Sequence, residues 1–127
     1  MTNLSGAVLA AIAAAAIPNA VIGQWGGDHV TLEVTAQDAM LKLDCADGRF
    51  AMPVLVDRQG RFVATGTLTP YGAGPTHADA AATTLPAAFN GHVAQDELTL
   101  IVSVHGTGSP TIYRLTRNRR TKLVRCM

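Results

Sequence analysis

The stretch HVTLEVTAQDAMLKLDC, residues 29–45, decides the fold class. Apolar and polar side chains alternate over residues 29–35 and again over residues 40–45. A period of two places one face of a strand against a core and the other in water. Residues 36–38 between the two halves are short enough for a hairpin turn, and Asp38 suits one. The stretch therefore predicts two adjacent antiparallel strands.

The same alternation recurs along the rest of the chain. It predicts six more strands, over residues 50–56, 62–68, 89–93, 98–104, 112–116 and 122–126. Tight turns are expected between most of them, among others at residues 46–48, 58–60 and 95–96. Pro53 marks its strand as an edge or a bulge.

Eight such strands predict an all-β fold, an antiparallel up-and-down meander. Closure into a barrel hides the edges of a meander this long, and a two-sheet sandwich is the alternative. The one long connection, over residues 70–86, is expected to shape the mouth of the barrel.

An unbroken apolar run at residues 7–17 ends at Pro18. It is too short for a membrane span, which needs about 20 residues, and it matches the apolar part of a secretory signal, although residues 1–6 lack Lys and Arg. We expect a signal helix in an export segment over residues 1–20, cleaved after Ala16 or Ala20, and one barrel domain over residues 21–127. No cysteine follows the run, so the expected location is periplasmic or secreted without a lipid anchor. A buried N-terminal helix is the alternative.

Cys45 and Cys126 are the two cysteines of the chain. They lie far apart and form no Cys-x-x-Cys pair, and an even count in an exported chain predicts a disulfide. Closing a loop of about 80 residues stabilises a fold by about 4.5 kcal/mol in the loop-entropy model. The alternative is two unpaired buried thiols.

The charge of the chain is unevenly distributed. Of the 127 residues 48% are hydrophobic and 15% charged, with a net charge of +1, which excludes a disordered chain and gives no sign of a nucleic-acid partner. Four cations lie at the turn of a predicted C-terminal hairpin: Arg117, Arg119, Arg120 and Lys122. They predict an exposed patch for an anionic surface, such as envelope phosphates, or for an acidic partner. The alternative is a solvated turn.

The segment Gly23-Gln24-Trp25 precedes the first predicted strand. Here the chain resembles the lipocalin-like calycins, in which Gly-x-Trp opens the first strand and the Trp plugs the closed end of the barrel. An Arg from the last strand packs across that Trp, so the resemblance implies this role for Arg125, with Arg114 second. Such a cation–π contact contributes about 0.5–2 kcal/mol. The chain is also similar to small uncharacterised secreted bacterial proteins of the same layout. An ordinary core aromatic is the alternative for Trp25.

The sequence carries no catalytic signature. The pairs Asp28-His29 and His77-x-Asp79 offer two ligands each, too few for a metal site. A nucleophile elbow and a phosphate loop are also missing. We therefore expect no enzyme, no cofactor and no metal.

Two functions follow from these observations. The first is an exported binding protein for a small apolar ligand, because eight strands enclose room for one. The alternative is an envelope protein that acts through protein contacts, as a structural element or a protease inhibitor. The chain is similar in size and disulfide count to small bacterial inhibitors of secreted metalloproteases, which are also eight-stranded barrels with a disulfide bond. This resemblance implies an inhibitory arm at residues 20–23. Either protein is expected to be a monomer.

Overall fold

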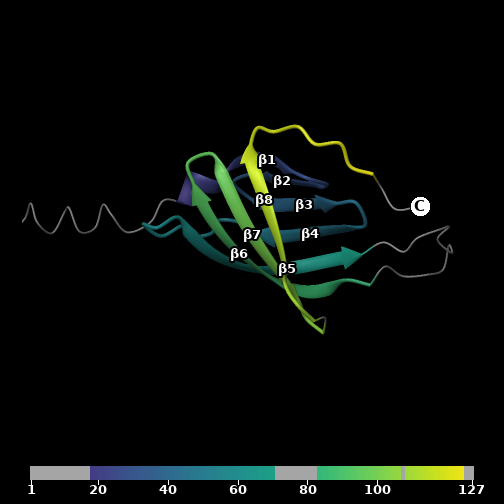
Figure 1. The fold of residues 1–127 in the computed structure, drawn as a ribbon. Coiled ribbons are helices and arrows are strands. Elements are labelled where there is room, and N and C mark those ends of the chain that lie inside the picture. Colours follow the sequence, from purple (N-terminus) through teal and green to yellow (C-terminus); the bar gives the residue numbers. More distant parts are fainter. Residues whose placement is uncertain (1–17, 71–82, 107, 125–127) are drawn as a thin grey trace, which may run out of the picture.

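Eight strands pair in the order of the sequence and close into an antiparallel barrel (Figure 1). The computed structural model describes residues 18–70, 83–106 and 108–124. A short 3-10 helix, η1, precedes the barrel. The elements are η1 (Pro18–Val21), β1 (Gly23–Gly27), β2 (Val30–Val34), β3 (Asp38–Leu43), β4 (Ala46–Ala51), β5 (Arg61–Pro70), β6 (Leu85–Ala94), β7 (Glu97–Val104) and β8 (Thr111–Arg117). The predicted all-β closed barrel is confirmed, and the predicted signal helix lies outside the described residues.

The barrel has two distinct ends. At one end, here called the η1 end, η1 leads into β1 beside the end of β2, and Ala20 lies near the β4–β5 connection and the β6–β7 turn. The β6–β7 turn is visible at this end in Figure 1. The β1–β2, β3–β4 and β7–β8 connections lie at the opposite end. No helix among the described residues is long and apolar enough to cross a membrane.

Three phenylalanine rings fill the middle of the barrel. The ring of Phe50 lies 4.9 Å from that of Phe89 and 6.2 Å from that of Phe62, measured between centroids. Gly91 leaves room for this cluster, because a Cβ atom at this position would overlap the ring of Phe62. The barrel is therefore packed at mid-height, as interior side chains of an eight-stranded barrel are expected to be.

The fourth strand lies earlier in the chain than the alternation predicts. β4 covers Ala46–Ala51, and the turn expected at residues 46–48 instead falls at Asp44 and Cys45. Pro53 has no N–H to donate to a neighbouring strand, so the ladder ends before it. Val54 and Val56 are still buried, at 5% and 1% exposure, while Leu55 between them is 72% exposed. Of the strand predicted over 50–56, residues 50 and 51 therefore belong to β4, and the alternation beyond them reflects burial without strand pairing.

The structure adds a strand before the first predicted one, and residues 122–124 of the last predicted strand are not in a strand. Residues 23–27 form β1, which pairs with β2 along its whole length and with β8 at two positions, Trp25↔Arg117 and Gly26↔Thr116. Residues 122–124 form no strand. The predicted C-terminal hairpin is absent, because β8 ends at Arg117 and Asn118 turns the chain with a φ of 60°.

Residues 118–124, here called the C-terminal strap, run back along the outside of the barrel toward the end opposite η1 (Figure 1). The backbone N–H of Asn118 donates to the carbonyl of Gln24, and the Thr121 hydroxyl donates to that of Gly27. The first part of the strap is thus bound to β1 by hydrogen bonds.

Candidate functional site

Trp25 closes the η1 end of the barrel. Its side chain is 1% exposed, and its indole N–H donates to the carbonyl of Val21 at 2.9 Å. Val21 itself is fully buried. The indole therefore satisfies its one donor by binding the backbone of η1, and this bond fastens η1 to the barrel.

Arg117 packs over the face of the indole. Its guanidinium carbon lies 4.2 Å from the centre of the Trp25 ring. Its two terminal nitrogens donate to the carbonyls of Ile22 at 3.0 Å and Ala20 at 2.8 Å. Its Nε lies 3.3 Å from a carboxylate oxygen of Asp96. One side chain thus joins β8 to the segment that precedes β1.

The arginine at this position is not one that the resemblance singled out. Arg114 is exposed, and Arg125 lies outside the described residues. Arg117 occupies the place because it is the register partner of Trp25 in the β1–β8 pair. Gly23 lies next to it with a φ of +137°, and a Cβ there would stand 3.1 Å from the Arg117 guanidinium. Only the strand register identifies the arginine, and sequence reasoning had no signal for it.

Residues 20–23 do not form the free arm of an inhibitor. Val21 is buried in the core, the carbonyls of Ala20 and Ile22 accept from Arg117, and Gly23 belongs to β1. These residues are part of the barrel and are therefore not available to enter the cleft of a protease.

The end opposite η1 has a different lining. By the alternation of each strand, five side chains here face the interior and are only partly buried: Leu43, Leu68, Leu85, Val104 and Tyr113. Burial raises the pKa of the Tyr113 phenol, and a hydrogen bond with Thr111 opposes this shift. The lining is apolar with one phenol among the five. The connection predicted to shape this mouth lies largely outside the described residues.

The four cations of the predicted anion patch have different surroundings in the structure. Arg117 packs on Trp25, and Arg119 donates to a carboxylate oxygen of Asp28 at 2.9 Å. Arg120 and Lys122 are exposed on the strap. The four side chains therefore do not act as one exposed group.

A groove of about 600 Å³ lies beneath the beginning of the strap. One wall is the strap itself, residues 118–121. Residues of β1, β2 and β3 form the rest, most of them with outward-facing side chains, such as Lys42 on β3. Trp25 and Leu32 also line the groove, although their side chains are buried in the core. This groove is on the outer face of the barrel, and no motif in the sequence indicates it.

The far part of the strap is tied to the β3–β4 turn. The backbone N–H of Val124 donates to one carboxylate oxygen of Asp44, and Nδ1 of His29 lies 2.8 Å from the other. Asp44 precedes Cys45, and Val124 stands two residues before Cys126. Cys126 lies outside the described residues, so its pairing with Cys45 stays a prediction that this contact supports.

The candidate metal ligands do not converge. Asp28 binds Arg119 and His29 binds Asp44, while His77 and Asp79 lie outside the described residues. The described residues contain no group of three or more side chains that would hold a metal ion. His92 is exposed, as its place in the alternation predicts.

Comparison with protein-family models, with curated proteins and with solved structures gave no match. What is established is the small, closed, eight-stranded β-barrel. The resemblance to the calycins rests on Gly23, Trp25 and an arginine over the indole.

Proposed function

We propose that this chain is an exported, lipocalin-like binding barrel that holds a small apolar molecule at the end opposite η1, and that it is not an enzyme. The observation that carries the proposal is the difference between the two ends. Trp25, Arg117 and η1 close one end with a set of mutually satisfied contacts. The other end presents partly buried apolar side chains toward the interior.

The lining of that end suits an apolar ligand. Small-molecule sites are mostly apolar and contain a few polar groups that orient the ligand. Leu43, Leu68 and Val104 supply apolar surface, and the Tyr113 hydroxyl supplies a polar group. The phenylalanine cluster below limits the depth, so the ligand is expected to be small.

Replacing Leu68 with Gln weakens binding of the neutral apolar dye Nile red about fivefold or more. The reason is that the ligand then buries a side-chain amide to which it offers no hydrogen bonds. Val63→Gln is the matched control, since Val63 lies on the same strand but is 68% exposed on the outer face. A fluorescence titration of both variants measures the difference, and thermal unfolding checks that both remain folded. Equal affinities in the two variants, or no saturable binding to the unmodified protein, would contradict the proposal.

Export predicts a mature N-terminus at Ile17. Cleavage after Ala20 would place a charged ammonium group on Val21, which is fully buried, and an unpaired charge there is costly. Cleavage after Ala16 leaves η1 and the Ala20 carbonyl in place for Arg117. N-terminal sequencing of the protein from its own host tests this, and a chain that begins at Val21 or keeps Met1 would contradict it.

A further inference from the structure

We propose that the groove beneath the C-terminal strap is a second binding site, for a small polar molecule that carries a phosphate group. The site lies on the outer face of β1, β2 and β3 and shares none of the interior residues of the proposed apolar site. Evidence against one of the two proposed sites therefore does not count against the other.

The strap is held at a fixed position over β1. The Asn118 N–H donates to the Gln24 carbonyl at 2.7 Å, and the Thr121 hydroxyl donates to the Gly27 carbonyl at 2.9 Å. Between these bonds the strap passes directly over Gly26, where a Cβ atom would overlap the carbonyl oxygen of Arg119. Glycine at this position thus permits the close approach that makes the strap a wall of the groove.

The floor of the groove follows from the strand register. Gln24, Glu33 and Met40 are neighbours across three strands, and Thr31 and Lys42 are neighbours in the next row. Residues that share a row on one face of a sheet have adjacent side chains. Hydroxyl, amide and charged groups therefore cover most of the floor, and Met40 is the one long apolar side chain of the lining that lies on the outer face.

The charges favour an anion. Four cations line the groove or contact its lining, and three carboxylates lie beside them, of which Asp47 is the register partner of Lys42 on β4: Lys42, Arg49, Arg119, Arg120, Glu33, Asp28 and Asp47. Arg119 is paired with Asp28, and Glu33 accepts from the side chain of Gln24 at 3.2 Å. Among the described residues no carboxylate lies within 4.0 Å of the ammonium of Lys42 or the guanidinium of Arg120. An ammonium from the floor and a guanidinium from the strap thus remain available to the same ligand.

Phosphate matches these two groups. A guanidinium donates two parallel hydrogen bonds to phosphate oxygens, and an ammonium adds a point charge. The volume of about 600 Å³ exceeds what a bare phosphate needs and lies within the range of small-molecule sites. The hydroxyls of Thr31 and Thr121 and the amides of Gln24 and Asn118 suit a hydroxylated body attached to the phosphate.

The test is a titration of the full chain with inorganic phosphate and with glycerol 3-phosphate, followed by NMR chemical shifts of the backbone amides. Shifts that saturate and centre on residues 118–121 and on β2 and β3 are expected, with glycerol alone producing none. Lys42→Gln and Arg120→Gln each weaken glycerol 3-phosphate binding about tenfold, as the loss of one charge-assisted hydrogen bond implies. Lys122→Gln is the matched control, since Lys122 is an exposed cation of the strap that does not line the groove. It changes the affinity less than twofold.

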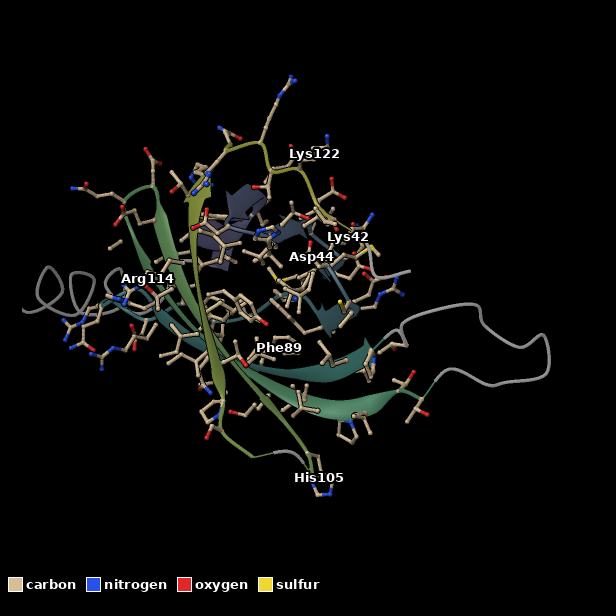
Figure 2. All side chains as sticks on the ribbon, turned by 45° about the vertical axis from the view of Figure 1, so that its right-hand side comes forward. Lys42, Asp44, Phe89, His105, Arg114 and Lys122 are labelled. Atoms are coloured by element: carbon tan, nitrogen blue, oxygen red, sulfur yellow. The ribbon has the colours of Figure 1, made fainter. Side chains whose placement is uncertain are left out.

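Vesicles containing phosphatidylglycerol distinguish a lipid headgroup from a free phosphate compound. If the headgroup is the source, vesicles bind, Lys42→Gln reduces that binding more than Lys122→Gln, and glycerol 3-phosphate competes. If the source is a soluble compound, glycerol 3-phosphate binds and the vesicles do not. Equal losses in Lys42→Gln and Lys122→Gln, or no saturable shift with either phosphate probe, would overturn the site and leave Nile red binding at the other end unaffected. Figure 2 shows Lys42 and Lys122 on the same side of the barrel, so the two variants change the charge of one region.

Discussion

Replacing Trp25 with Ala lowers the free energy of unfolding by about 3–5 kcal/mol, the range expected for removal of a large buried side chain. The indole is 1% exposed, and the carbonyl of Val21 loses its donor when the ring is removed. Arg117 at the same time loses the ring that it covers. Urea unfolding followed by circular dichroism measures the loss, since the variant has no tryptophan fluorescence.

Two further variants separate the contributions at Trp25. Trp25→Phe retains a ring for Arg117 but loses the indole N–H, so its loss is smaller than that of Trp25→Ala. Gln24→Ala is the neighbouring control, because Gln24 is exposed and surface changes cost at most about 0.5 kcal/mol. If Trp25→Ala lowers the free energy of unfolding by less than about 1 kcal/mol, the indole does not contribute to closing this end of the barrel.

Removing the predicted Cys45–Cys126 disulfide lowers the free energy of unfolding by about 4.5 kcal/mol, the loop-entropy value for a closed loop of about 80 residues. The hydrogen bond between Val124 and Asp44 supports the pairing, because Asp44 precedes Cys45 and Val124 stands two residues before Cys126 in the sequence. Urea unfolding of the double variant Cys45→Ser, Cys126→Ser measures the loss. Asp44→Asn is a control that weakens the tie to the strap but keeps both cysteines.

Mass analysis tests the bond itself. The exported protein is expected to be two hydrogens lighter than its reduced form and to resist alkylation until it is reduced. Two thiols that alkylate without reduction would contradict the disulfide and weaken the proposal of export.

The binary pattern of the sequence predicts most of the barrel. β2, β3, β5, β7 and β8 lie within a few residues of the predicted strands, because each of them has one buried and one solvated face. Such a strand carries its own period of two, and that period can be read from the residues alone. The large number of strands, and the short connections between most of them, also favour closure of the sheet into a barrel.

Other features of the barrel depend on contacts between distant residues. β1 is rich in glycine and lacks a strong pattern, so its pairing with β2 decides its structure. The pattern over residues 50–56 reflects strand pairing only at residues 50 and 51 and burial alone beyond them, because pairing ends before Pro53. Local pattern cannot separate these two causes of alternation.

The sequence by itself determined the all-β fold class and most of the strands, and it singled out Trp25. The predicted total of eight strands agrees with the barrel only because the missed strand β1 offsets the strand predicted over residues 122–126. Only the tertiary structure decided that Arg117 covers the indole, that Arg119 binds Asp28, and that the strap forms a groove with Lys42. Periodicity is a property of neighbouring residues, whereas the partner of a cation depends on strand register and on the path of the chain after the last strand. Several basic residues lie close together in this sequence, and the fold gives them different partners.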